Sequence, residues 1–154
     1  ISIYVSYDKG FGYIIPESIK ELGNDDVDKY KNQMETIETW YKEWQKSLGG
    51  KGEKSNEDAR FVLPNACETR IMVTMNTREL MHFFALRMCN RAQWEIREMA
   101  EQMFRLCLKT APALFINSGP ACIRGTCPEG EKSCGKALQI REARKQLLKS
   151  ISEE

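Results

Sequence analysis

The stretch "NRAQWEIREMAEQMFRLCLKTAPALF", residues 90–115, decides the fold prediction, because it reads as one long amphipathic helix with a sharp stop. The residues predicted to form its buried line recur at helical spacing: Ile96, Met99, Ala100, Met103 and Cys107. Pro112 begins a further short turn. The first turns of this helix carry two arginines, a glutamine and a glutamate beside a tryptophan. A helix that only packs into a core does not need so many polar groups there.

Amphipathic helices are predicted on both sides of this stretch. Residues 24–48 keep apolar side chains at helical spacing and stop at Gly49 and Gly50. The pattern of Ser55 and Asp58 resembles a capping box, which predicts a short helix ending near residue 64. A last helix is predicted over residues 136–151.

The helix just before residue 90 has the clearest start signal. Asn76 is a good N-cap residue, and Glu79 three positions later completes the pattern of a capping box. The stripe along this helix is predicted to hold Leu80, Phe83, Phe84 and Arg87.

Two segments are predicted to be extended. Residues 11–16 are rich in β-forming side chains and fit a strand or an extended arm, and residues 68–76 carry the partly alternating, β-branched pattern of a strand. The predicted fold class is therefore α+β: mainly helical with a small antiparallel sheet, in a single domain covering residues 1–154.

Composition limits the classes of partner. Basic and acidic residues number 23 and 22, and a net charge of +1 leaves no broad positive field for nucleic acid. No apolar run approaches the roughly 20 residues that a membrane span needs. The first ten residues lack the features of a secretory signal, so a cytoplasmic location is expected, with the six cysteines mostly as thiols.

Four arginines fall within one short region of the sequence: Arg70, Arg87, Arg91 and Arg97. One interpretation is that they are surface residues paired with nearby acids such as Glu95, since exposed ion pairs are common and weak. The other is an anion-binding site, because guanidinium forks match phosphate and carbonyl groups and a helix N-terminus adds a positive dipole.

The run "ETRIMVTMNTRELMHFFALRMCNRAQWEIREMAEQM" resembles the C-terminal half of flavin-dependent thymidylate synthases, also called thymidylate synthase complementing proteins. Its T-R, N-x-R-x-L, L-R and A-Q-W-E-I-R elements are specific as a combination. "FVLP" before it and "GPACIRGTCPEG" after it are also similar to the family. The resemblance covers residues 4–150 and favours the anion-site interpretation.

The resemblance implies a chemistry and a role for each arginine. The family methylates dUMP to dTMP with methylenetetrahydrofolate, using a hydride that passes from NADPH through FAD. Arg70 and Arg97 would bind dUMP, and Arg97 would also favour ionisation of the uracil ring at N3. Arg87, Asn90 and Arg91 would bind FAD. The resemblance further implies a homo-oligomer, expected to be a tetramer.

The sequence departs from the family at its most diagnostic motif. It contains no R-H-R, and Tyr4 takes the place of the tyrosine in the S-x-R-Y that follows it, which puts Ile1 and Ile3 at the serine and arginine places. These 154 residues alone are therefore expected to be unable to make dTMP. The alternative function is a catalytically inactive helical oligomerisation module derived from the enzyme.

The remaining candidate residues carry no catalytic prediction. His82 has no partner that indicates acid–base work, and the family's reaction needs no cysteine nucleophile. Cys122, Cys127 and Cys134 follow C-x4-C-x6-C spacing, in which a metal site would lack its fourth ligand, so no metal is assigned.

Overall fold

The computed structural model describes residues 7, 10–50 and 52–152, the last two without their side chains. Tyr4, Ile1 and Ile3 lie outside the described residues. The described chain forms two compact units, unit 1 within residues 1–72 and unit 2 within residues 73–154, and each is described here by itself. The expectation of a single domain stays a prediction. None of the described helices is both long and apolar enough to cross a membrane.

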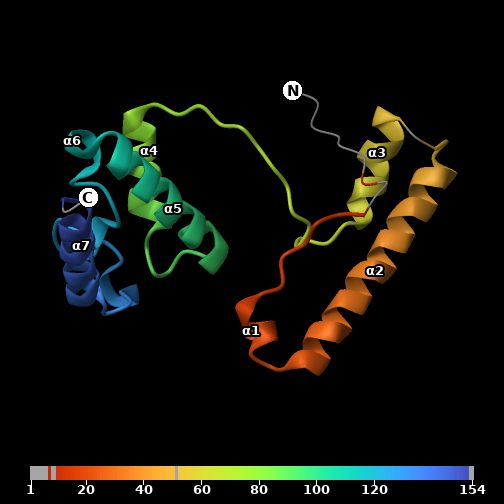
Figure 1. Ribbon diagram of the computed structural model, residues 1–154, viewed down its shortest axis with the longest axis horizontal. Coiled ribbons are helices and arrows are strands. Elements are labelled where there is room, and N and C mark those ends of the chain that lie inside the picture. The colour runs from red at the N-terminus through yellow and green to blue at the C-terminus, as the bar shows by residue number, and fades with distance from the viewer. Residues whose placement is uncertain (1–6, 8–9, 51, 153–154) are drawn as a thin grey trace. The chain divides into compact units, whose positions relative to one another are not determined.

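Unit 1 is built around one long helix (Figure 1). Its elements are α1 (Glu17–Lys20), α2 (Asn24–Ser47), α3 (Glu53–Ala59) and the 3₁₀ turn η1 (Arg60–Val62). The predicted end of α2 is confirmed: Gly49 and Gly50 have φ of 102° and 86°, a region that favours glycine. The amide of Gly50 donates to the carbonyl of Gln45 at 3.0 Å and so closes the last turn.

The core of unit 1 mixes aromatic and polar side chains. Tyr41 is fully buried and Phe11 is 7% exposed, and the Tyr7 ring meets both edge-on. Gln45 of α2 donates a hydrogen bond to Asn56 of α3, and both side chains are buried. Unit 1 is thus held by hydrogen bonds between side chains as well as by apolar packing.

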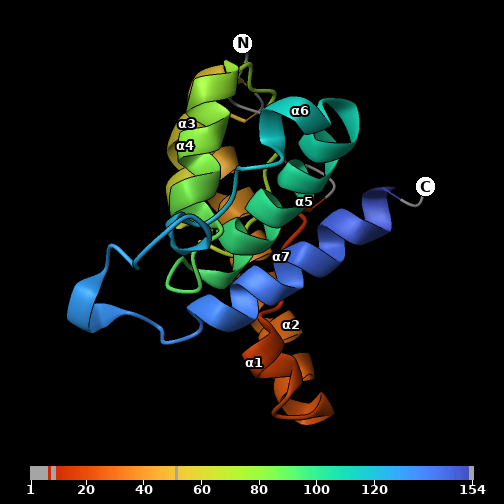
Figure 2. The ribbon, with the colours of Figure 1, turned by 90° about the vertical axis from the view of Figure 1, so that its left-hand side faces the viewer.

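Unit 2 contains the long helix predicted within residues 90–115, the helix predicted after Asn76 and the last predicted helix. Its elements are α4 (Thr77–Arg87), α5 (Trp94–Thr110), α6 (Pro112–Phe115), the 3₁₀ turns η2 (Ala121–Ile123) and η3 (Gly130–Lys132), and α7 (Ala137–Ser152). The predicted N-cap of α4 is confirmed, since the Asn76 side chain accepts from the Glu79 amide at 2.9 Å. Figure 2 shows the loop between α6 and α7 leaving the helices and returning to the start of α7.

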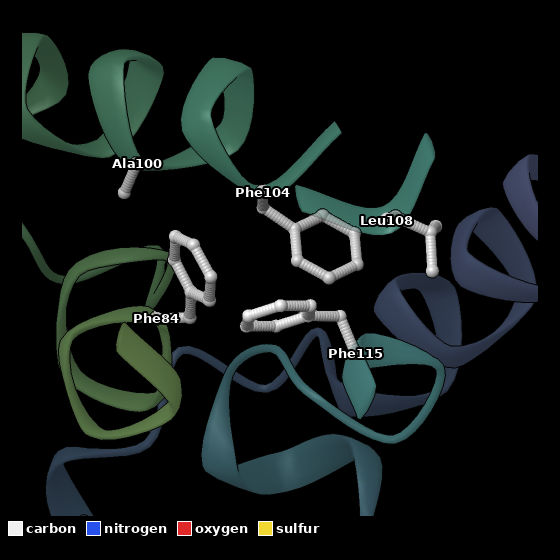
Figure 3. Packing of buried hydrophobic residues seen from close by; sticks show 5 residues of the cluster. All are labelled: Phe84, Ala100, Phe104, Leu108 and Phe115. Atoms are coloured by element: carbon white, nitrogen blue, oxygen red, sulfur yellow. The ribbon is translucent and has the colours of Figure 1, made fainter. Parts of the chain in front are cut away.

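Three phenyl rings form the centre of unit 2 (Figure 3). Phe84 of α4, Phe104 of α5 and Phe115 of α6 are 0%, 1% and 4% exposed. The Phe84 ring meets Phe104 at 5.5 Å and Phe115 at 6.0 Å between centroids, both edge-to-face. Such pairs each contribute about 0.5–1.5 kcal/mol beyond the area they bury. This cluster joins α4, α5 and α6.

The predicted antiparallel sheet is wrong. In the described part of the chain the β pairing is a single antiparallel bridge between Tyr13 and Cys67, with no strand. Two backbone hydrogen bonds flank it, from Ile14 to Ala66 and from Glu68 to Gly12. An extended segment becomes a strand only where a second segment continues the ladder. Beyond Glu68 the segment is without regular structure up to residue 76, and all its side chains except that of Met75 are exposed, Met72 by 96%. The fold is helical.

The predicted short helix after residue 55 also needs correction. Helix α3 begins at Glu53, with Gly52 at its N-cap, so Ser55 lies inside the helix. The Ser55 hydroxyl donates instead to the carbonyl of Leu48 at 2.9 Å. The hydroxyl therefore ties α3 back to the end of α2, and the capping-box prediction fails.

Candidate functional site

The candidate residues of unit 2 gather at the turn between α4 and α5. Helix α4 ends at Arg87 and α5 begins at Trp94, so the prediction of one helix starting at Asn90 is wrong for its first four residues. The reason is the Gln93 side chain, which accepts from the amides of Glu95 and Ile96, both at 3.0 Å, and starts α5 there. Residues 88–93 are left to form a turn.

Arg97 is held against that turn. It lies on the first turn of α5 and is half-buried. Its Nη1 donates to the carbonyl oxygen of Asn90 at 3.4 Å. The structure thereby brings together two of the predicted site residues, with the guanidinium beside the N-terminal end of a 17-residue helix. A guanidinium has five N–H donors, so this one contact leaves Arg97 able to bind a planar or anionic group.

Arg91 points from the same turn towards the loop between α6 and α7. Its Nη1 donates to the Glu129 carboxylate at 2.8 Å, and the two side chains are 42% and 43% exposed. The surface interpretation named nearby acids such as Glu95 as partners of the arginines, but Arg91 pairs with an acid 38 positions along the chain. Exposed ion pairs contribute at most about 1 kcal/mol, so a phosphate could displace Glu129 at little cost.

The other two predicted arginines are exposed. Arg87 is the last residue of α4 in unit 2, and Arg70 belongs to unit 1, in the segment without regular structure. Since each unit is described by itself, the prediction that Arg70 and Arg97 line one site stays a prediction. The same holds for Arg87, Asn90 and Arg91 as a group that binds FAD.

A half-buried arginine that the sequence analysis missed lies on α7. Arg144 donates to the carbonyls of Phe115 and Ile116 at 3.1 and 2.8 Å, and its guanidinium carbon lies 4.1 Å from the centre of the Phe104 ring. Its buried Nε and Nη1 have no hydrogen-bond partner among the described residues, and burial lowers the pKa of the Arg144 guanidinium. A pocket of about 280 Å³ is lined by both Arg144 and Asn90. No sequence pattern distinguishes Arg144 from the other basic residues of α7.

A second pocket, of about 100 Å³, lies where the α4–α5 turn meets the loop between α6 and α7. Asn90 and Arg91 line it from the turn. Four of the six cysteines line it as well, and we call it the thiol pocket: Cys89, Cys122, Cys127 and Cys134. Burial raises the pKa of the Cys122 thiol, and repulsion from the charge on a neighbouring thiolate, first of all Cys127, raises it further.

Comparison with known proteins identifies the family. Residues 2–113 match the family described as thymidylate synthase complementing protein. The chain belongs to this family. The matched range contains all five predicted site residues, from Arg70 to Arg97, whereas the loop with Cys122, Cys127 and Cys134 lies beyond it.

Three relatives of this chain are each named flavin-dependent thymidylate synthase. Over 150 residues it is 44% identical to the flavin-dependent thymidylate synthase of Clostridium tetani, a match covering 90% of this chain and 59% of that one. It is 61% identical over 85 residues to the enzyme of Geobacter sulfurreducens of the same name, covering 55% and 37%. The match to that of Pyrococcus abyssi is 44% over 125 residues, covering 77% and 48%. The chain thus spans about half the length of the curated relatives it matches.

Proposed function

We propose that this chain is part of a flavin-dependent thymidylate synthase. In the proposed reaction, a one-carbon unit passes from methylenetetrahydrofolate to dUMP and is reduced to the methyl group of dTMP. The single observation that carries the proposal is the family match over residues 2–113, which includes every arginine of the predicted site. The relatives' shared name supports it. The proposed setting is the cytoplasm, with NADPH as the source of reducing equivalents.

Arg97 is proposed as the residue that activates the substrate. A guanidinium beside the uracil ring stabilises the negative charge that forms when N3 loses its proton. The contact between Arg97 and the Asn90 carbonyl would hold the guanidinium in place for this role. Arg70 is proposed to bind the same nucleotide, where its fork matches a phosphate or a carbonyl group.

Arg87, Asn90 and Arg91 are proposed to bind FAD. The donors at the α4–α5 turn fit a dinucleotide with two phosphates, because two are guanidinium groups and the ion pair that engages Arg91 is exposed. Bound flavin, once NADPH has reduced it, would supply the hydride for reducing the transferred carbon. The residues of this chain would bind and orient the cofactor against the nucleotide.

A homo-oligomer, expected to be a tetramer, is part of the proposal. Large apolar side chains are exposed in both units: Phe61 by 89%, Met72 by 96%, Leu106 by 69% and Leu138 by 77%. Surface of this kind is typical of contacts between subunits. The same observation supports the second candidate function, an inactive helical oligomerisation module. Absorbance of a bound flavin separates the two, since only the enzyme needs FAD.

Nucleotide binding tests the site directly. Titration calorimetry with dUMP should show that Arg97→Ala weakens binding about 10- to 150-fold, because losing a charged hydrogen bond costs about 1.5–3 kcal/mol. The matched control is Arg105→Ala, which removes an exposed arginine from the same helix and should leave the affinity unchanged. If both variants bind dUMP as the unaltered chain does, Arg97 is wrongly assigned.

Whether these 154 residues alone can make dTMP is a separate prediction. Because the R-H-R motif is absent from these 154 residues, we expect them not to support growth of a thymidine-requiring bacterial strain. The Clostridium tetani relative, expressed from the same vector, is the positive control. Growth on the 154 residues alone would establish a complete site within them and refute this prediction.

A further inference from the structure

The thiol pocket is a feature that the proposed reaction does not use. Three of its cysteines come from the loop between α6 and α7, and the fourth, Cys89, follows α4. Sequence spacing groups only the three cysteines of the loop, because Cys89 lies far earlier in the sequence. The fold therefore supplies the fourth sulfur that the C-x4-C-x6-C pattern lacks. Cys67 and Cys107 do not line this pocket.

Backbone and side-chain contacts hold both sides of the pocket. The amide of Ala92 donates to the carbonyl of Cys89 at 2.8 Å and closes the turn after α4. Arg141 of α7 donates to the carbonyls of Cys122, at 2.9 Å, and Gly125, which fixes the start of the loop. The ion pair between Arg91 and Glu129 joins the turn to the middle of the loop. These contacts join the turn, the loop and α7 around the four thiols, which line one pocket.

We propose that this pocket is a structural metal site, in which one Zn²⁺ ion is bound by four thiolates: Cys89, Cys122, Cys127 and Cys134. Structural zinc sites are tetrahedral and are commonly closed by four cysteines. The rest of the lining is mainly small or apolar, including Ala85, Ala121, Ala137 and Ile140. Such a lining gives the four thiols few hydrogen-bonding partners.

Metal binding requires the four sulfur atoms to move closer to one another. Among the described residues, no three His, Cys, Asp or Glu side chains are arranged to hold a metal ion in the present conformation. The loop must therefore move towards Cys89, and the exposed contact between Arg91 and Glu129 opposes such a shift only weakly. Each coordinating thiol releases its proton to solvent, so four protons leave and a site of net charge −2 forms. Arg91 and Arg141, which hold the turn and the loop, lie where their charge offsets it.

The consequence is a fixed α4–α5 turn. Cys89 directly precedes Asn90 and Arg91, so a metal bound to Cys89 would restrain the residues proposed to bind FAD. The metal site does not rest on that proposal, since the loop cysteines lie beyond the range that matches the family. Its role would be structural, with all four positions taken by protein.

Metal content of the purified chain tests the inference. After incubation with Zn²⁺ under reducing conditions and gel filtration, elemental analysis should find one zinc per chain. Cys89→Ser and Cys127→Ser should each lower that content several-fold. Cys67→Ser and Cys107→Ser, the matched controls outside the pocket, should retain it. No zinc in the unaltered chain, or equal zinc in Cys89→Ser, would overturn the assignment.

Two measurements on the unaltered chain keep the test decisive if a serine variant fails to fold. Titration with Co²⁺ should produce the thiolate charge-transfer and visible bands of a tetrahedral cobalt site. Alkylation followed by mass spectrometry should show that Zn²⁺ protects the four pocket cysteines and leaves the reactivity of Cys67 unchanged. Alkylation of all six cysteines at equal rates, a disulfide among the four, or bound iron with sulfide would each refute the zinc site.

Discussion

The two units of the molecule have cores built from different kinds of side chain. Unit 2 is centred on phenyl rings, with Phe84 and Phe104 almost fully buried and meeting edge-to-face. Unit 1 buries the phenol of Tyr41 and joins its helices through the amides of Gln45 and Asn56. Helix starts differ in the same way. Asn76 and Gln93 cap helices of unit 2, whereas the N-cap residues in unit 1 are proline or glycine, which have no side-chain acceptor.

The difference indicates where each unit is vulnerable. An apolar core loses stability when volume is removed, because the cavity that remains forfeits contacts on every side. A core with polar groups depends on whether each group is paired, and the Tyr41 hydroxyl has no hydrogen-bond partner among the described residues. Substitutions that remove volume should therefore matter most in unit 2, and substitutions that remove a polar group should have their smallest cost at Tyr41.

The largest effect is expected for Phe104→Ala. Phe104 is 1% exposed and contacts both the Phe84 ring and the Arg144 guanidinium, so truncation should lower the free energy of unfolding by about 3–5 kcal/mol. Hydrogen exchange of peptides from α4 and α5, measured by mass spectrometry, reports this loss locally. Leu106→Ala is the matched control on the same helix, because Leu106 is 69% exposed. Equal acceleration in both variants would contradict the phenyl core.

A smaller loss, of about 1.5–3 kcal/mol, is expected for Arg144→Met. The change keeps the apolar stem of the side chain but removes the charged hydrogen bonds to the carbonyls of Phe115 and Ile116. Exchange should accelerate in α6 and the start of the following loop. Lys145→Met serves as the control, since the neighbouring Lys145 side chain is 71% exposed. A variant as stable as the control would mean that the two unpaired nitrogens of Arg144 cost as much as its bonds contribute.

The sequence predicted the helices better than their buried faces. The spans of α2 and α7 and the Asn76 cap follow from spacing and capping, which are local properties. The predicted buried line of α5 shares only Ala100 with the buried residues, which are Ala100, Phe104 and Leu108. Two apolar lines run side by side on this helix: the line that includes Phe104 is fully buried by packing against Phe84 and Phe115, whereas Met103 and Cys107 of the predicted line pack at the edge of the core and are only partly buried. Which line is fully buried depends on other helices, so spacing within α5 could not reveal it.

Long-range proximity explains the remaining differences. The strand prediction for residues 68–76 relied on a local pattern, but a strand needs a partner segment to continue the ladder, and the described pairing ends at the Tyr13–Cys67 bridge. Sequence spacing could not group Cys89 with the other pocket cysteines, because Cys89 lies far from them along the chain and only the fold brings it to the same pocket. The four arginines were singled out from the sequence and received their roles from the family's motifs, whereas the contact between Arg97 and Asn90 became visible only in three dimensions.

The side-chain caps that only unit 2 has among the described helices should each contribute about 1 kcal/mol to stability, which can be tested at Asn76. Asn76→Ala removes the acceptor for the Glu79 amide, which should cost about 0.5–2 kcal/mol and fray the first turn of α4. Asn76→Asp keeps an acceptor in the same position and is the matched control. Exchange rates of the α4 amides distinguish the two, and equal rates in Asn76→Ala and Asn76→Asp would show that the cap contributes nothing.

The smallest effect, and one of opposite sign, is expected for Tyr41→Phe in unit 1. Tyr41 is fully buried, and its hydroxyl finds no partner among the described residues, so the folded state carries the cost of removing that group from water. Phenylalanine keeps the ring that packs edge-on against Tyr7 at 6.0 Å and removes only the oxygen. The free energy of unfolding, from hydrogen exchange of α2 peptides, should stay unchanged or rise by up to about 1 kcal/mol. Tyr30→Phe is the contrasting control, because the Tyr30 hydroxyl donates to the Ile14 carbonyl at 3.2 Å and its removal should destabilise. If Tyr41→Phe proves the more destabilising of the two, the hydroxyl is paired in solution, and the contrast between the two cores must then be drawn from volume alone.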